Sequence, residues 1–264
     1  MKVIGIDPAP KKGLTIFGDV KTEWENPVPI NRSREFIKEL KYEKDLLVCW
    51  DSPLTGPPFA VVEGNDEAQD SDYTQRPIEH FSSCKDFDFK ANNCISVNPY
   101  SGLSHWTISR SLIGLPRTGP YDNSEKLPFS LISDETKKPN SGLNIVEVHP
   151  ALAMWLWLHE QKDIDSWKYK GDHQVCEYFW KRLLKIEVFK EIFLNACHQE
   201  SLYDDNLLDA RIAYALGCLL LKDNNSVIIL GNLDLGTFLL PNVKNLGERF
   251  RAFIENRDQH VSRP

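Results

Sequence analysis

The first fifty residues alternate short apolar runs with turns and one amphipathic segment. Three runs are rich in β-branched and large apolar residues, as strands are; they are Lys2–Asp7, Leu14–Phe17 and Leu46–Asp51. The segment Val20–Trp24 is expected to pair with the second run as a hairpin or meander. In Ser33–Tyr42 the apolar residues lie on one side and the charges on the other, which predicts a helix.

Beyond residue 142 the pattern is mainly helical. Asn144–His149 is a further strand candidate, and the proline after it suits the first turn of a helix. The expected helices are Ala151–Glu160, Asp172–Leu184, Glu187–Cys197, Asp204–Leu221 and Val243–Glu255. Two short strand candidates, Val227–Leu230 and Thr237–Leu240, precede the last helix. This order predicts a single α/β domain over residues 1–264 with a central sheet.

Residues 52–142 interrupt this order. A Gly/Pro turn at Thr55–Pro58, the acidic stretch Glu63–Asp72 and several prolines after residue 115 break the apolar periodicity. Only Gln75–Ser82 and Leu103–Leu115 are expected to be helical. So long a stretch between two strand candidates predicts an irregular capping insertion rather than a simple connection.

The composition narrows the class of protein. The chain has 264 residues, a formal charge of −7 and 41% hydrophobic residues. These values suffice for a buried core and exclude a collagen, a disordered chain and a disulfide-rich miniprotein. The acidic balance argues against a broadly basic nucleic-acid clamp.

Several features predict a cytoplasmic protein without a membrane segment. The longest near-apolar stretches, Ala151–Leu158 and Ile212–Leu221, fall short of the roughly 18–20 residues that span a bilayer. The N-terminal sequence MKVIGIDPAP lacks the long apolar centre of a secretory signal. The six cysteines include no CxxC pair and are expected to be reduced thiols. The oligomeric state stays open.

Acidic residues recur near the C-terminal ends of the strand candidates. Asp7, Asp51 and Glu147 each stand there, and each is followed by a proline within three residues. Acidic residues are depleted in strands and are rarely buried unpaired. Ligands of open α/β sheets bind at this edge. The recurrence therefore points to a functional site.

The helix predicted over Asp204–Leu221 adds two further acids. Asp205 and Asp209 are four residues apart and so share a face of the helix. Asp209 lies on a stripe that is otherwise apolar, and nearby alanines would allow the helix to approach the sheet closely. An acid in this position is expected to point toward the strand edge.

These acids form a candidate metal site. Carboxylates that gather without compensation raise one another's pKa values, and Mg²⁺ or Mn²⁺ removes that cost. We expect Asp7, Asp51, Glu147 and Asp209 to be catalytic, with Asp205 as an additional metal ligand. Paired divalent ions stabilise both the attacking and the leaving oxygen in phosphodiester hydrolysis. Each acid also has a structural alternative, such as a helix cap, a turn or an ion pair.

The same residues carry a family resemblance. GIDPAPKKG, CWDSPLTG, VEVHPALAMW and DDNLLDARIAYALG, in this order, make the chain resemble the ribonuclease H-like superfamily and, within it, the predicted-nuclease family called domain of unknown function 429. The resemblance covers roughly residues 1–60 and 143–241. It implies a mixed sheet of about five strands flanked by helices, and an acidic metal site that cleaves nucleic acid or a nucleotide. Asn206 stands where such proteins often have a second aspartate.

Four further residues are candidates for substrate contacts. Lys11 and Lys12 follow Asp7 closely and are expected either to meet a substrate phosphate or to be solvated. Arg76 lies in the predicted insertion and is a candidate to line the site from above. His149 is either a proton-transfer group or a hydrogen-bonded residue at the end of its strand.

Two other functions stay open from the sequence. An actin-like or sugar-kinase-like phosphotransferase also begins with a GID-like strand, but it needs small residues after the aspartate to cradle phosphate. Here Pro8, Ala9 and Pro10 follow. A ribonuclease H-like binding protein without turnover is the second alternative, suggested by the acidic charge and by Asn206.

Overall fold

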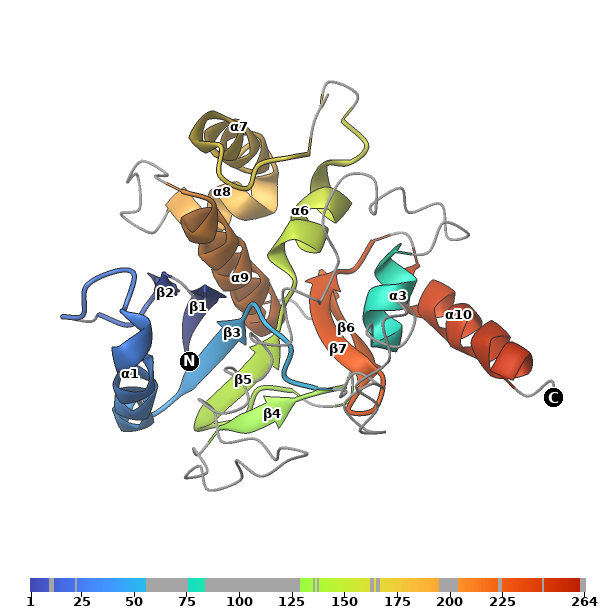
Figure 1. Ribbon diagram of the computed structural model, residues 1–264, viewed down its shortest axis with the longest axis horizontal. Helices are drawn as coiled ribbons and strands as arrows, with labels where there is room; N and C mark the ends of the chain where they lie inside the picture. The colour runs from blue at the N-terminus through green and yellow to red at the C-terminus, as the bar shows by residue number, and fades with distance from the viewer. Residues whose placement is uncertain are drawn as a thin grey trace, which may run out of the picture.

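The chain folds around a five-stranded mixed sheet. The computed structural model describes residues 1–9, 12–21, 23–55, 76–83, 129–134, 136, 138–161, 164, 167–194, 204–222, 225–243 and 245–261. The strands of the central sheet are β1 (Lys2–Ala9), β2 (Gly13–Gly18), β3 (Leu46–Trp50), β4 (Ser130–Ile132) and β5 (Leu143–Glu147). Their order is β2-β1-β3-β5-β4, with only β2 antiparallel to its neighbour (Figure 1). The predicted α/β class with a central mixed sheet is confirmed.

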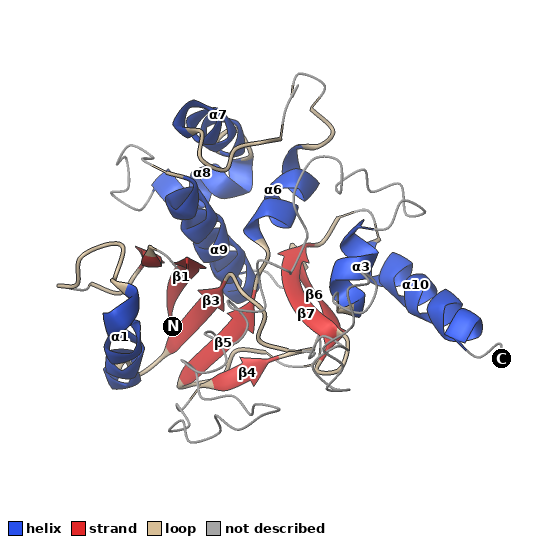
Figure 2. Ribbon diagram, viewed as in Figure 1, coloured by secondary structure: helices blue, strands red, loops and turns tan. Residues whose placement is uncertain are grey.

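Helices cover this sheet, and a hairpin extends it (Figure 2). The described helices are α1 (Ser33–Glu39), α3 (Pro77–Ser83), α6 (Pro150–Leu158), α7 (His173–Leu183), α8 (Glu187–Leu194), α9 (Asp205–Lys222) and α10 (Leu246–Val261). Short 3-10 turns, Ile30–Arg32 and Leu40–Tyr42, flank α1. The hairpin consists of β6 (Val227–Asn232) and β7 (Gly236–Pro241).

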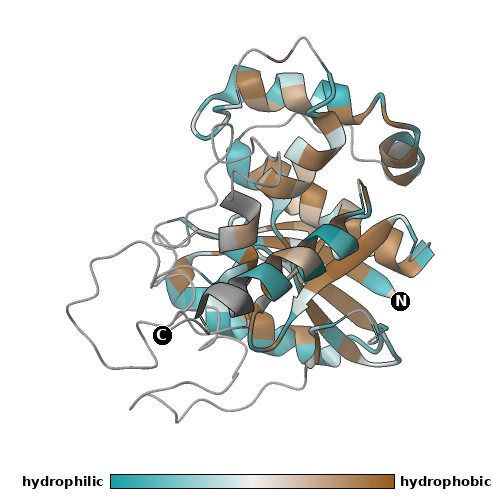
Figure 3. Cartoon of the chain, turned by 90° about the vertical axis from the view of Figure 1, so that its right-hand side faces the viewer, coloured by the Kyte–Doolittle hydropathy of each residue, from teal (hydrophilic) through white to brown (hydrophobic). Residues whose placement is uncertain are grey.

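The two faces of the sheet bury different cores because side chains alternate along each strand. Val3, Leu47 and Val146 face the core that contains α9 and α6. The intervening residues Ile4 and Val48 face a smaller core that contains apolar residues of α1. The strands are therefore apolar on both sides, and they are largely brown in Figure 3. This is the pattern expected of a parallel sheet covered on both faces.

Helix α9 lies directly on β1. A Cβ atom at Gly5 would stand 2.1 Å from the Ala210 carbonyl oxygen, and one at Gly217 would stand 2.5 Å from the Cys49 sulfur. Only glycine leaves room for this approach. The close contact fixes the height of α9 over the ends of β1 and β3, where the acids lie.

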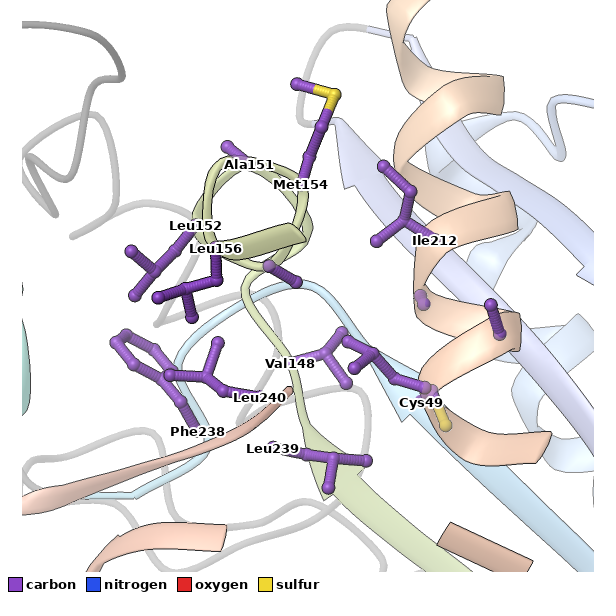
Figure 4. Close-up of a cluster of buried hydrophobic side chains, with 14 of the residues drawn as sticks. Cys49, Val148, Ala151, Leu152, Met154, Leu156, Ile212, Phe238, Leu239 and Leu240 are labelled. Atoms are coloured by element: carbon purple, nitrogen blue, oxygen red, sulfur yellow. The ribbon is translucent and has the colours of Figure 1, made fainter. Parts of the chain in front are cut away.

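The hairpin joins the sheet beyond the end of β5. Val148 forms an isolated parallel bridge with Leu239, and both side chains are buried beneath α6 with Leu152 and Phe238 (Figure 4). Helix α3 packs against β7 and α10. The side chains of Phe81 and Phe250 meet edge to face there, with ring centroids 5.2 Å apart.

Three details differ from the sequence-based predictions. β4 lies inside the predicted insertion of residues 52–142, yet it is an edge strand of the central sheet, parallel to β5. The described residues of Val20–Trp24 form no strand; Val28 instead bridges Leu14. β1 continues past Pro8 and stays paired with β2. The ladder between β1 and β3 has already ended at Ile6, so β3 offers no partner for the N–H that proline lacks.

The predicted helix Gln75–Ser82 corresponds to α3, whereas Leu103–Leu115 lies outside the described residues. None of the described helices combines the length and the apolar character needed to cross a lipid bilayer.

Candidate functional site

Asp7 and Asp51 lie side by side at the same edge of the sheet. Ile6 pairs with Trp50 in the parallel ladder, and the N–H of Asp51 donates to the Ile6 carbonyl at 3.0 Å. The two aspartates are the next residues of their strands, so alternation turns both toward the face that α9 covers. Asp7 is 7% exposed, and Asp51 is half-buried. The predicted proximity of these two acids at a strand edge is thus present in the structure.

Asp209 reaches the same edge from α9. It is 1% exposed and directly precedes Ala210, whose carbonyl lies against Gly5 of β1. Asp205 lies one turn earlier in the helix, with 13% of its side chain exposed. Asp204 caps the helix by accepting a 2.9 Å hydrogen bond from the Leu207 N–H. The close packing of α9 on β1 is therefore what brings Asp209 to the two strand-end aspartates.

Two residues from the segment before α7 contact Asp209. The Tyr169 hydroxyl donates to Asp209 Oδ1 at 2.8 Å. The Lys170 ammonium pairs with Asp209 Oδ2 and lies 3.9 Å from an oxygen of Asp205. Sequence reasoning missed both residues, because they belong to a short segment without periodicity or a recognisable motif.

Asp7 is a buried acid without a partner. Its carboxylate forms no hydrogen bond or ion pair within the described part of the chain, although it is more than nine-tenths buried. Burial raises the pKa of Asp7 to about 8; Lys170 opposes this rise, and Asp209 adds to it. Because ionising a largely buried, unpaired carboxyl group is expensive, Asp7 keeps its proton at neutral pH, and this raised pKa is the main electrostatic feature of the site.

The pKa values of the neighbouring acids Asp51 and Asp209 are raised as well. Burial raises the pKa of Asp51 well above its usual range, and the charges of Asp7 and Asp209 add to that effect. Burial also raises the pKa of Asp209, against the opposing influence of Lys170 and Tyr169. The three aspartates are thus close enough to influence one another's pKa values, and the charge of Lys170 opposes the rise in pKa of each.

Glu147 does not join the three aspartates. It pairs with Trp50 in the β-ladder, one row before Asp51, so alternation turns it toward the opposite face of the sheet. There it is 0% exposed and binds the Arg76 guanidinium through two contacts, 2.6 Å and 3.0 Å long. The N–H of Leu54 donates to the same carboxylate at 2.8 Å. The charge of Glu147 still raises the pKa of Asp51, but its pairing with Arg76 distinguishes it from Asp7, with which it was predicted to share the metal site.

Arg76 is likewise fully engaged. Its guanidinium lies between Glu147 and Glu79, with Nε donating to Glu79 at 2.7 Å, and Nη1 donates to the Thr55 carbonyl at 2.7 Å. Although burial lowers the pKa of Arg76, the two carboxylates raise it by more. The residue is 2% exposed. A guanidinium with this set of partners stabilises the fold and leaves no free donor fork for the predicted substrate contact.

His149 caps α6 at the end of β5. Its Nδ1 accepts from the N–H of Leu152 at 3.5 Å, and its ring meets Phe238 edge to face with centroids 5.1 Å apart. Burial lowers the pKa of His149 to about 3, and the charges of Lys170 and Arg76 act in the same direction. The imidazole is therefore neutral at neutral pH, in line with the structural alternative for this residue.

The two predicted lysines of the β1–β2 turn have different outcomes. Lys12 is exposed, and its ammonium lies 3.8 Å from Asp204 at the start of α9. Lys11 lies outside the described residues.

The arrangement as it stands is not that of a closed metal cage. Among the described residues, no group of three or more His, Cys, Asp or Glu side chains is arranged closely enough to hold a metal ion. Instead, Asp205 and Asp209 contact the ammonium of Lys170, whose charge also acts on Asp7 and Asp51. Chemically, the site is an edge of the sheet where three aspartates with raised pKa values lie near a single lysine.

Comparison with known proteins yields no relative: no family model, no curated protein and no solved structure gives a significant match to this chain.

Proposed function

We propose that the chain is a metal-dependent phosphodiester hydrolase of the ribonuclease H-like type, acting on nucleic acid or a nucleotide. Asp7, Asp51 and Asp209 would hold Mg²⁺ or Mn²⁺, and Asp205 is placed to assist from the preceding turn of α9. Glu147 is left out of this ligand set because Arg76 already neutralises it.

The buried, unpartnered carboxylate of Asp7 is the observation that carries the proposal. Proteins rarely retain such a group unless a ligand compensates its charge. Asp51 at the adjacent strand end also lacks a hydrogen-bonding partner for its carboxylate within the described part of the chain. Carboxylate oxygens at one strand edge are the donor set that Mg²⁺ and Mn²⁺ prefer. The chemistry of these donors therefore suits a hard divalent cation, and the side chains would have to draw closer together around it than they stand in the described arrangement.

The ion and the protein would have separate tasks. A bound divalent ion supplies Lewis-acid stabilisation of the charge that develops on a phosphoryl group. The aspartates orient that ion through a rigid sheet edge and a helix that cannot move away from Gly5 without losing close contacts. The Tyr169 hydroxyl fixes one oxygen of Asp209 and leaves the other to Lys170 or to a cation.

The central sheet is compatible with the ribonuclease H-like resemblance, and the backbone directly after Asp7 is the observation that bears on the phosphotransferase alternative. The central sheet has one antiparallel edge strand, β2, and four parallel strands, and its first strand carries the proposed ligand Asp7. A phosphate-cradling turn is not found directly after Asp7, since β1 continues in the ladder through Pro8 to Ala9. The backbone N–H groups that would bind a nucleotide phosphate are therefore not free at this point.

A Mn²⁺ titration followed by thermal unfolding tests the proposal. We expect Mn²⁺ to raise the melting temperature of the wild-type protein in a saturable way, because an ion that binds only the folded state stabilises it. In Asp7→Asn the increase should be lost. Asp234→Asn removes an exposed acid from the β6–β7 turn and should behave like the wild type.

A cleavage screen over single-stranded, duplex, hybrid and branched nucleic acids completes the test. We expect Mn²⁺-dependent cleavage that disappears in Asp7→Asn and persists in Asp234→Asn. Equal stabilisation of wild type and Asp7→Asn by Mn²⁺ contradicts the metal site. Stabilisation without cleavage of any substrate favours a binding protein instead of a hydrolase.

A further inference from the structure

Lys170 is held at the site by a short strap, residues 167–172, between α6 and α7. The strap is anchored on its inner side: Tyr169 is 2% exposed, its carbonyl accepts from the Cys176 thiol at 3.2 Å, and its hydroxyl donates to Asp209. The Trp167 ring stacks on Phe179 with centroids 5.2 Å apart. These contacts fix the backbone of the strap beside α9.

The Lys170 side chain itself is not fixed in the same way. It is 57% exposed, whereas its partner Asp209 is 1% exposed. The next residue, Gly171, has φ +78°, a left-handed conformation that turns the strap into α7 without strain. Lysine has a flexible four-carbon stem, so the ammonium can leave the aspartates for solvent while the anchored backbone stays in place.

We propose that Lys170 is a tethered counter-cation: its ammonium balances the aspartates when no divalent ion is bound and withdraws when an ion binds. This inference rests on the proposed function and concerns how the same site is regulated. The lysine and the ion compete for the same oxygens, because Lys170 pairs with the Asp209 oxygen that Tyr169 leaves unoccupied. The affinity for the ion then depends on how much more strongly the aspartates bind the divalent ion than the ammonium of Lys170.

The charge balance favours competition over coexistence. An ammonium between Asp209 and Asp205 repels a divalent ion brought to the same carboxylates, because like charges a few ångströms apart repel. The charge of Lys170 opposes the rise in the pKa values of Asp7, Asp51 and Asp209 alike. In the metal-free protein the single ammonium thus offsets part of the charge of the three aspartates.

The test is a calorimetric Mn²⁺ titration of full-length wild type, Lys170→Gln and Lys170→Arg. We expect Lys170→Gln to bind Mn²⁺ about tenfold more tightly or better, since it loses both the competitor and a repelling charge. Lys170→Arg keeps the charge and should bind with nearly the wild-type affinity. Lys181→Gln removes an exposed lysine of α7 that pairs with Glu177 at 3.2 Å, and it should leave the affinity unchanged.

A second measurement follows Lys170 in the wild-type protein. Acylation of lysine amines, read by mass spectrometry, should become faster at Lys170 when Mn²⁺ is added and stay constant at Lys181. Weaker or unchanged Mn²⁺ binding by Lys170→Gln, or an unchanged labelling rate, overturns the inference while leaving the proposed metal site intact. If neither wild type nor Lys170→Gln binds Mn²⁺, the proposed function fails and this inference fails with it.

Discussion

At the scale of single residues, the strand-end acids show two ways of treating a buried charge. Glu147 is saturated by Arg76 and by the N–H of Leu54, which is how structural acids are satisfied. Asp7 has no such partner in the described part of the chain and carries a strongly raised pKa. The sequence places both acids at the ends of strands, but only the contacts distinguish a structural acid from a candidate ligand.

The pH dependence of stability should isolate Asp7. Its pKa is about 8 in the folded protein against an ordinary value of 3.8, so between these values the folded state holds a proton that the unfolded state has lost. In the absence of divalent ions, the free energy of unfolding should therefore fall as pH rises from about 4 to about 8. Each pKa unit corresponds to about 1.4 kcal/mol.

Asp7→Asn removes this titration, so the variant should match the wild type near pH 4 and be more stable by several kcal/mol near pH 8. Urea unfolding curves collected across this range measure the difference. A difference between the two proteins that stays constant with pH would contradict the role given to burial at Asp7.

Substitutions in the Arg76–Glu147 pair should destabilise the protein, whereas Asp7→Asn should stabilise it near pH 8. Arg76→Met leaves Glu147 and Glu79 buried without their counter-ion and should cost about 3–5 kcal/mol of unfolding free energy. Glu147→Gln should cost less, about 1–3 kcal/mol, because Arg76 keeps Glu79. Glu147→Gln should also keep the Mn²⁺ response, which separates it from Asp7→Asn.

The exposed pair of Lys181 and Glu177 is the control for this series, and Lys181→Met should cost less than about 1 kcal/mol. Denaturant unfolding measures the free energy of unfolding of each variant, and the Mn²⁺ titration measures its response to the ion. Loss of the Mn²⁺ response in Glu147→Gln would return Glu147 to the ligand set.

At the scale of elements, the apolar pattern was sufficient for most of the fold. The runs that end at Asp7 and Asp51 proved to be neighbouring parallel strands, and the stripe around Asp209 proved to be the face of α9 that packs on them. Register could not be read from the pattern: Glu147 pairs with Trp50, not with Asp51, and so faces the other side. A shift of one residue reverses the face of a side chain.

Neither the contact of Lys170 with α9 nor the strand β4 could be predicted from the sequence, for related reasons. The strap that holds Lys170 has no helical or strand periodicity, so nothing in it predicts that it meets α9. β4 is only three residues long, Ser130–Ile132, and lies within a proline-rich stretch. Its identity comes from pairing with β5, a long-range interaction that local pattern does not encode.

Gly5→Ala tests how far the site depends on the approach of α9 to β1. The new Cβ would lie 2.1 Å from the backbone oxygen of Ala210 and 2.6 Å from the Tyr214 nitrogen, so the helix must move. We expect a loss of about 3 kcal/mol or more of unfolding free energy. The Mn²⁺ response should weaken as well, because Asp209 moves with the helix.

Gly247→Ala in α10 is the matched control. Its Cβ would meet only the end of the Ile228 side chain, at 3.0 Å, and alanine favours a helix over glycine by about 1 kcal/mol. This variant should be near neutral or slightly stabilised in a denaturant melt and should keep the Mn²⁺ response. Wild-type Mn²⁺ affinity in Gly5→Ala would show that the site does not rely on this contact.

At the scale of the whole molecule, the sheet edge that carries the acids is enclosed from several sides. α9 packs on β1 and β3, and the β6–β7 hairpin lies beyond the end of β5 (Figure 1). The strap of residues 167–172 places Lys170 against Asp209. The hydroxyls of Thr55 and Thr237 lie 3.0 Å apart and link the segment after β3 to β7. The result is one anionic edge held by elements from distant parts of the sequence.

The most direct test of this account is anomalous diffraction from crystals of the wild-type protein soaked with Mn²⁺. We predict a Mn²⁺ peak within about 2.0–2.3 Å of carboxylate oxygens of Asp7, Asp51 and Asp209, with the Lys170 ammonium displaced from Asp209. Glu147 should still be paired with Arg76. Crystals in which Mn²⁺ is absent from this edge at saturating concentration, while Lys170 stays bound to Asp209, would contradict the central claim.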